Sequence, residues 1–266
     1  MPVKRSNIGY VDFSGGDANF VIGCTPSSPG CAHCYARRIV ERGGRDFSEV
    51  RVYPEKLYRL GQAKFEEKGV PFRRGLGSRP LMFVVDMGDM FHPFVSSAFI
   101  SDALDVMVGR PDVDWLVLTK RAARLLEFYQ NGWPDNIWPG VTVENSDCLW
   151  RVDYLLQVKS DRRWVSIEPM LEEINLRPVL NRCRWCYPRF CTNGIHADFP
   201  HAMLAWIVVG GESGPNRRPF NPDWARAIRD QCLAAQVPFF YKQGSAHHPG
   251  RDDILDGRTW KQIPGG

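Results

Sequence analysis

Residues 20–35 read FVIGCTPSSPGCAHCY and carry three cysteines, Cys24, Cys31 and Cys34, which are separated by six and then by two residues. The apolar run at 20–24 is typical of a short buried strand, and the Pro- and Gly-containing segment after it is typical of a loop. A helical segment follows at 31–43. This order predicts the first strand, loop and helix of an α/β fold, with the cysteines at the junction.

The same order continues along the chain. Short apolar runs rich in Val, Ile and aromatic residues predict strands near 80–87, 114–120, 137–145, 163–169, 205–213 and 238–243. Helical segments lie between them at 52–68, 95–110, 120–131, 146–159 and 221–236, the last with Asn221 as N-cap and Pro222 at the first helical position. Because right-handed crossovers join such units, we predict a mostly parallel sheet forming a partial (β/α)6-type TIM barrel. We expect one domain over residues 1–266, with a small Cys/His-rich, metal-binding insertion at about 177–202.

Polar residues follow directly on five of the predicted strands. Since parallel strands present their carboxyl ends at one edge of a sheet, we expect these residues to form one rim, where barrels carry their function. Any one cluster alone is more typical of a helix cap or a loop, but five on successive strands favour a binding site. The clusters are Asp86-Met87-Gly88-Asp89, Thr119-Lys120-Arg121, Glu144-Asn145, Ser166-Ile167-Glu168 and Gly210-Gly211-Glu212-Ser213.

The first cysteine group offers three thiol ligands rather than four. Structural zinc is normally enclosed by four protein ligands, whereas three thiolates on a four-iron cluster leave one iron open to another ligand. We therefore favour a [4Fe-4S] cluster bound by Cys24, Cys31 and Cys34. The alternatives are a zinc site completed by His33 and three unrelated buried cysteines.

A second group lies in the predicted insertion and consists of Cys183, Cys186, Cys191 and His196. Its spacing equals that of a zinc knuckle with the last two ligand types exchanged, and thiolates with one imidazole suit tetrahedral zinc. An auxiliary iron–sulfur cluster, with His201 or Cys232 as fourth ligand, and cysteines without metal are the alternatives. Arginines and aromatic residues interleave with these ligands. Such a mixture is typical of a surface that stacks on bases and binds phosphate, and equally of a local core with solvated arginines.

The composition is that of a soluble globular protein, with 266 residues of which 44% are hydrophobic and 24% charged. No apolar run approaches the roughly 18 residues that span a bilayer, and no apolar segment of a secretory signal follows the N-terminus. We therefore expect a cytoplasmic location and no membrane partner. The net charge of +4 and the pI of about 8.6 permit an acidic partner without requiring one.

The three cysteines resemble those of the radical S-adenosylmethionine superfamily, whose members carry three cysteines after the first barrel strand, the last two spaced by two residues. The usual first spacing is three residues and here it is six, and His33 stands where an aromatic residue is usual. A closer resemblance is to a phage-associated family of unknown function in that superfamily. The matching segments, over roughly residues 8–245, are GC at 23–24, GCAHCYA at 30–36, GDMFH at 88–92, LTKR at 118–121, GVTVEN at 140–145, SIEP at 166–169, GGESG at 210–214 and FFYKQ at 239–243.

The resemblance implies that the open iron chelates S-adenosylmethionine and that one electron cleaves this cofactor to a 5′-deoxyadenosyl radical, which abstracts hydrogen from the substrate. It therefore also implies a reducing electron donor. The implied cofactor contacts are Asp86, Gly88 and Asp89 for the amino group, Lys120 or Arg121 for the carboxylate, Glu144 or Asn145 for the ribose hydroxyls, and Gly210 and Gly211 for the adenine, with His33, Tyr35, Ser166, Glu168 and Glu212 beside them.

The leading interpretation is a radical S-adenosylmethionine enzyme acting on a nucleotide or a DNA base. If a phage encodes the protein, we expect it to hypermodify phage DNA and to work in the host cytoplasm. The second interpretation is a radical lyase that repairs DNA photoproducts. The third is a non-catalytic, zinc-stabilised nucleic-acid-binding protein in which both cysteine groups are structural.

Overall fold

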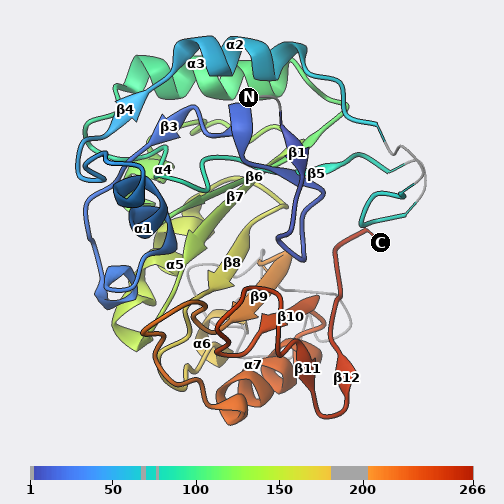
Figure 1. Cartoon of the computed structure of the whole chain (residues 1–266). Helices are drawn as coiled ribbons and strands as arrows, with labels where there is room; N and C mark the ends of the chain where they lie inside the picture. The colour runs from blue at the N-terminus through green and yellow to red at the C-terminus, as the bar shows by residue number, and fades with distance from the viewer. Residues whose placement is uncertain (1–2, 67–69, 76–77, 181–202, 266) are drawn as a thin grey trace.

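The centre of the computed structural model is one curled sheet of eight strands (Figure 1). The structure describes residues 3–66, 70–75, 78–180 and 203–265. The strands of the sheet, in the order in which they neighbour one another, are β1 (Lys4–Arg5), β2 (Phe13–Ser14), β5 (Leu81–Phe83), β6 (Asp114–Thr119), β7 (Ile137–Thr142), β8 (Trp164–Ile167), β9 (Trp206–Gly210) and β10 (Phe239–Gln243). Every pairing from β2 to β10 is parallel, and β1 runs antiparallel to β2. The α/β class and the mostly parallel half-barrel sheet are therefore confirmed.

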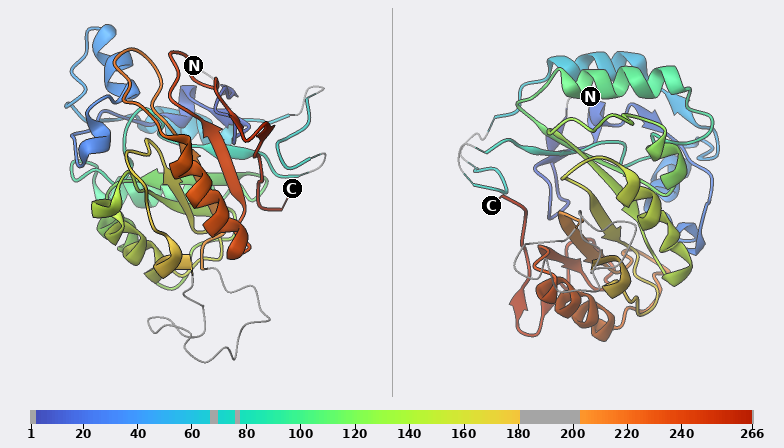
Figure 2. Two further views of the ribbon diagram at one scale, coloured as in Figure 1. Left: turned by 90° about the horizontal axis from the view of Figure 1, so that it is seen from below. Right: turned by 180° about the vertical axis from the view of Figure 1, so that it is seen from behind.

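Helices flank this sheet. They are α1 (Tyr35–Arg42), α2 (Pro54–Gln62), α3 (Ser97–Val108), α4 (Ala122–Leu126), α5 (Trp150–Gln157), α6 (Arg177–Leu180) and α7 (Pro222–Ala234). The helices α2 and α3 lie side by side over the end of the sheet that holds β5, and α7 lies at the end that holds β9 and β10 (Figure 1, Figure 2). Asn221 caps α7 as predicted, because its side chain accepts a hydrogen bond from the backbone of Asp223 and Pro222 begins the helix.

The two faces of the sheet have different cores. Side chains alternate between the faces along each strand, and the outer face packs beneath the helices. The inner face holds a separate, largely aromatic cluster of Tyr10, Val11, Leu81, Phe83, Leu116, Trp138, Trp164, Trp206, Val208 and Phe240. At the carboxyl ends of β7, β8 and β9 the same alternation brings the smaller residues Thr142, Ser166 and Gly210 to the inner face. Bulky packing therefore fills the amino-end half of the half-barrel, and small or polar positions follow it.

The structure corrects the first strand prediction. Residues 20–24 do not belong to the eight-stranded sheet: β3 (Val21–Ile22) pairs antiparallel with β4 (Arg51–Val52), and the first parallel strand is β2. An isolated parallel bridge then joins Gly23 to Gly88, which lies on the segment that follows β5. The prediction was wrong because a short apolar run has the same pattern whether it pairs with the central sheet or with a local partner.

Other differences lie at the ends of elements and near the C-terminus. Most helices are shorter than predicted, and a hairpin of β11 (Ile254–Leu255) and β12 (Arg258–Thr259), absent from the predictions, follows β10. Of the predicted insertion, the structure describes residues 177–180, which form α6. None of the helices in the described part of the chain combines the length and the apolar character needed to cross a bilayer.

Candidate functional site

The three cysteines lie on the segment between β3 and α1, which we call the cysteine loop (residues 24–34). Cys31 ends the short 3₁₀ helix η2 (Pro29–Cys31), and Cys34 is the N-cap residue of α1. All three are free thiols with partly exposed side chains. Cys24 and Cys34 pack against the same small apolar cluster beneath α1, and Cys31 lies close enough to Cys24 to raise its pKa. The loop therefore gathers three soft donors in one region of the surface.

The thiols do not form a site for a single ion. Among the described residues, no group of three or more His, Cys, Asp and Glu side chains converges on a point suited to one metal ion. Zinc needs its ligands at about 2.0–2.3 Å, whereas the thiolates of a four-iron cluster bind different iron atoms. His33 faces Glu212 instead, with 3.0 Å between its Nδ1 and Glu212 Oε2. Glu212 therefore holds His33, the residue that would complete a zinc site with the three thiols.

Three carboxylate–arginine pairs hold the cysteine loop at the carboxyl ends of the strands. In each pair the carboxylate follows a strand of the sheet, and the pair also contacts a residue of the loop. The pairs are Asp89–Arg121 after β5 and β6, Glu144–Arg151 after β7, and Glu212–Arg218 after β9. The loop therefore lies along the predicted rim and is attached to it at three points.

The Asp89–Arg121 pair holds the start of the loop. Arg121 Nη1 donates to Asp89 Oδ2 at 2.8 Å and to Cys24 Sγ at 3.4 Å, and its Nη2 donates to the carbonyl oxygen of Thr25 at 3.0 Å. Burial, together with the nearby charge of Asp89, raises the pKa of the Cys24 thiol to about 11, although Arg121 opposes the shift. Cys24 is therefore protonated at neutral pH.

The Glu144 pair holds the middle of the loop. Glu144 Oε1 accepts from Ser28 Oγ at 2.6 Å and lies 2.8 Å from Lys120 Nζ, and its Oε2 accepts from Arg151 Nη1 at 2.7 Å. Burial alone would raise the pKa of this carboxyl, but the charges of Lys120 and Arg151 lower it below its ordinary value. A Cβ at Gly30 would lie 2.4 Å from Glu144 Cγ, so only glycine permits this approach. The carboxylate expected to contact ribose thus already has three protein donors.

The Glu212 pair holds the end of the loop. Besides His33, Glu212 accepts from the backbone N–H of Arg218 at 2.7 Å and from its Nε at 3.0 Å. Arg218 Nη1 also donates to the carbonyl oxygen of Pro29 at 3.1 Å. Arg38 of α1 donates to the carbonyl oxygen of Ser213 at 3.2 Å. Both η2 and α1 are thereby attached to the segment that follows β9.

A second polar group lies between the inner face and α1. The Tyr35 hydroxyl donates to the carbonyl oxygen of Asp86 at 2.6 Å, and burial raises the pKa of the Asp86 side chain. Lys242 forms an ion pair with Glu168, and its Nζ lies 5.9 Å from the centre of the Tyr10 ring. Burial, with Glu168 and Asp86 nearby, raises the pKa of Tyr10 well above its ordinary value. Two predicted site residues, Asp86 and Glu168, are therefore both close enough to Tyr10 to raise its pKa.

The remaining predicted site residues differ in what they contact. Asn145 Oδ1 is buried and has no hydrogen-bond partner among the described residues. Ser166 is buried on the inner face. A Cβ at Gly88 would lie 2.9 Å from the carbonyl oxygen of Val21, and one at Gly211 would lie 2.8 Å from the backbone of Gly244. These two glycines therefore permit close contact between backbone segments of the protein itself.

Sequence reasoning missed four residues that complete these contacts, namely Ser28, Arg151, Arg218 and Lys242. Lys242 had a usable signal, because it follows the inward-facing Phe240 by two residues in a predicted strand. Arg151 had no such signal, because the sequence of an amphipathic helix does not distinguish a buried arginine from a solvated one. The second cysteine group, Cys183, Cys186, Cys191 and His196, and also His201, lie outside the described residues.

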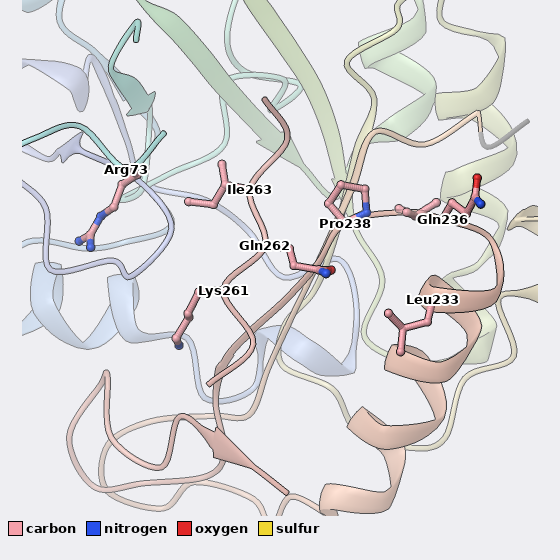
Figure 3. A pocket seen from close by; sticks show the side chains of 8 residues that line it. Arg73, Leu233, Gln236, Pro238, Lys261, Gln262 and Ile263 are labelled. Atoms are coloured by element: carbon pink, nitrogen blue, oxygen red, sulfur yellow. The ribbon is translucent and has the colours of Figure 1, made fainter. Parts of the chain in front are cut away.

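A pocket of about 450 Å³ lies at the amino ends of the strands, where β10 begins (Figure 3). Pro238, Gln262 and Lys261 line part of it. Lys261 Nζ donates to the carbonyl oxygen of Tyr241 at 2.7 Å and pairs with Asp253 at 3.1 Å, so its charge is satisfied within the protein. Because barrels carry function at the carboxyl ends of their strands, we place the candidate site at the cysteine loop.

Comparisons with known proteins give a family and a distant structural likeness. A family model described as protein of unknown function (DUF5131) matches residues 5–264. No curated protein sequence matches the chain. A structure of spore photoproduct lyase complexed with dinucleoside spore photoproduct is similar with a TM-score of 0.49 and 10% identity over 87% of this chain. A double mutant of that lyase with bound AdoMet and dinucleoside spore photoproduct is similar with a TM-score of 0.47 and 9% identity over 86% of this chain.

The chain spans 63% of the length of each of these two lyase chains. The family match, by contrast, extends over nearly all of the 266 residues. The chain therefore belongs to the DUF5131 family of proteins of unknown function.

Proposed function

We propose that this protein is a radical S-adenosylmethionine enzyme whose [4Fe-4S] cluster is bound by Cys24, Cys31 and Cys34. The observation that carries the proposal is that three free thiols on one loop are attached to the rim of a parallel half-barrel by three carboxylate–arginine pairs. A buried ion pair is costly to desolvate, and the carboxylates of all three pairs are largely buried, so a loop that merely connected two elements would gain little from them. A site that must hold a metal cluster gains preorganised ligands.

The donor set fits a cluster with one open iron. The cysteines supply three thiolates, and His33, the nearest other ligand in sequence, is engaged by a carboxylate. The positive charge of Lys120 lowers the pKa of Cys31, and that of Arg121 opposes the rise in the pKa of Cys24. The same two charges would offset the negative charge of the thiolates and sulfides of a cluster. When bound, the cluster and S-adenosylmethionine together supply a carbon radical that abstracts hydrogen, and the residues of this chain bind, orient and shield the reacting groups.

We propose Asn145 and Asp86 as the side chains that contact S-adenosylmethionine. Asn145 Oδ1 is buried without a hydrogen-bond partner among the described residues, so a ribose hydroxyl would satisfy it. Asp86 accepts one hydrogen bond from Asn19, and its charge acts on Tyr10 of the inner face, so it is an acceptor of the kind that a cationic amino group requires. Asp89 and Glu144 already accept several hydrogen bonds from the protein, and we propose that they anchor the cysteine loop.

Replacing Asn145 by alanine is expected to weaken the binding of S-adenosylmethionine about fivefold, because one uncharged hydrogen bond contributes about 1 kcal/mol. Calorimetric titration of the cluster-loaded protein measures this affinity. Asp147→Ala is the matched control, since Asp147 is exposed two residues further along, and it should bind like the wild type. Identical affinities for the two variants would remove Asn145 from the cofactor site.

We infer that the substrate is a nucleotide or a DNA base and that the protein works in the cytoplasm as one domain with an inserted metal-binding segment. The support comes from the sequence: the net charge is +4, and arginines and aromatic residues alternate with cysteines in 181–201, outside the described residues. Zinc or a second iron–sulfur cluster is proposed for that segment. We propose modification of a DNA base, including a base of phage DNA, as the reaction, with repair of a DNA photoproduct as the alternative.

Anaerobic reconstitution with iron and sulfide tests the enzyme proposal. The cysteine loop should bind about four irons, and 5′-deoxyadenosine should form when S-adenosylmethionine and dithionite are added. A colourless protein that holds zinc at both cysteine groups would contradict the proposal and support a structural, nucleic-acid-binding role. Adding undamaged or ultraviolet-irradiated DNA then separates the two reactions, because the true substrate should increase the yield of 5′-deoxyadenosine.

A further inference from the structure

We propose that Arg121 sets the reduction potential of the cluster by donating a hydrogen bond to the sulfur of Cys24, with Asp89 holding it in place. This inference rests on the proposed function. It assigns Arg121 as a positioning and tuning residue, in place of the contact to the carboxylate of S-adenosylmethionine that the sequence suggests.

The contacts of Arg121 are directed toward the cysteine loop. One guanidinium nitrogen, Nη1, is shared between Asp89 Oδ2 at 2.8 Å and Cys24 Sγ at 3.4 Å. The other, Nη2, donates to both oxygens of Thr25, at 3.0 Å to the carbonyl and at 3.3 Å to the hydroxyl. The side chain is 12% exposed, so this hydrogen bond to sulfur is largely shielded from water. A planar fork with several donors can make such contacts together, whereas a lysine cannot.

The carboxylate of Asp89 is itself fixed in orientation. It accepts from the Thr119 hydroxyl at 2.8 and 2.9 Å and from the backbone N–H of Phe91 at 2.9 Å. The Thr119 hydroxyl in turn accepts from the backbone N–H of Arg121 at 2.9 Å. The guanidinium is therefore oriented by β5 and β6 before any cluster is bound.

Neither Cys31 nor Cys34 accepts a hydrogen bond from a charged side chain among the residues that the structure describes, and Cys31 instead accepts from the backbone of Ser27 and Ser28. Near Cys31 the polar side chains are Ser27 and Ser28, whose hydroxyls lie 4.0 and 3.7 Å from its sulfur. The Ser28 hydroxyl donates its proton to Glu144 at 2.6 Å. Within the described ranges, Arg121 is thus the cation seen to donate a hydrogen bond to one of the three thiols.

Hydrogen bonds to the sulfur ligands and nearby positive charge both raise the potential of an iron–sulfur cluster. The reason is electrostatic: the reduced cluster carries one more negative charge, and a donor or cation beside it stabilises that form. Asp89 opposes this effect through its own charge. Arg121 lies between Asp89 and the sulfur, so its removal would leave the negative charge of Asp89 uncompensated beside the cluster.

The experiment is a one-electron redox titration of the reconstituted protein, in which dithionite supplies the electron and electron paramagnetic resonance reports the reduced cluster. Arg121→Met should shift the midpoint to a more negative potential. At the wild-type midpoint we expect about a tenfold lower ratio of reduced to oxidised cluster, which corresponds to about 59 mV for one electron. Arg121→Lys keeps the charge but not the fork, and it should shift less in the same direction.

Arg59→Met is the matched control, because Arg59 is likewise paired with an aspartate, with its Nη2 2.8 Å from Asp17 Oδ1, but makes no contact with the cysteine loop in the described structure. Its midpoint should equal that of the wild type. Midpoints of the two Arg121 variants that equal the wild type, with normal iron content, would overturn the inference. If Arg121→Met takes up no iron, Arg121→Lys alone decides. A wild-type protein that binds no cluster would instead overturn the proposed function.

Discussion

Alanine in place of Cys24, Cys31 or Cys34 is expected to abolish the iron–sulfur cluster of the cysteine loop. Each thiolate binds one iron, so losing one leaves a second iron open to solvent and exposes the cluster to loss. Iron and sulfide bound by the loop, together with the visible absorption of the cluster, should fall to background. No 5′-deoxyadenosine should form from S-adenosylmethionine. Iron analysis, absorption spectra and product chromatography on each single variant measure these effects.

Cys232→Ala is the control for this experiment, since Cys232 is fully buried in α7 and its pKa is raised by burial alone. This variant should retain the cluster. Iron that remains after all three loop cysteines are replaced reports on the second group, and replacing Cys183 and Cys186 as well should remove it if that group binds iron. Single loop variants with wild-type iron, absorption and product would show that these cysteines do not bind the cluster.

Replacing Glu144 by alanine is expected to lower the free energy of unfolding by about 3–5 kcal/mol, because it leaves a buried arginine charge without its partner. Arg151 is 1% exposed and Glu144 is fully buried, so water cannot replace the missing carboxylate. The variant also releases Ser28 from the rim. Urea unfolding monitored by circular dichroism measures the change, and cluster uptake should fall along with stability.

Glu41→Ala is the comparison for this prediction. Glu41 pairs with Arg37 on the surface of α1 at 3.9 Å and its side chain is 51% exposed. Exposed pairs of this spacing contribute about 0.3–0.5 kcal/mol, so this variant should unfold close to the wild type. Equal unfolding midpoints for the Glu144 and Glu41 variants would mean that the buried network does not stabilise the folded protein.

The alternation of strands and helices could be predicted because parallel strands buried on both faces leave a continuous apolar signal. The runs that became β6, β7 and β9 are of this kind, and all six residues of β7 are buried. The rim could be predicted as well, since residues that follow parallel strands must emerge at one edge. Thr119, Glu144 and Glu212 lie there in the structure.

The pairing of β3 could not be predicted in this way. Two apolar residues, Val21 and Ile22, carry too little pattern to show whether they join the central sheet or the local strand β4. The need for glycine at position 30 could not be predicted either. In the sequence Gly30 is an ordinary loop residue, and only the approach of Glu144 in the structure explains why no side chain fits there.

The sequence by itself determined the local features of this protein: the three thiol donors and their spacing, the strands and helices, and the polar residues at the strand ends. The tertiary structure decided which of these residues meet. Ser28 contacts Glu144 across 116 positions, and His33 contacts Glu212 across 179. Such contacts depend on how the whole sheet curls and not on local conformational preference, so they have no short-range signature in the sequence. For that reason carboxylates that looked like cofactor contacts are seen, once folded, to hold the cysteine loop.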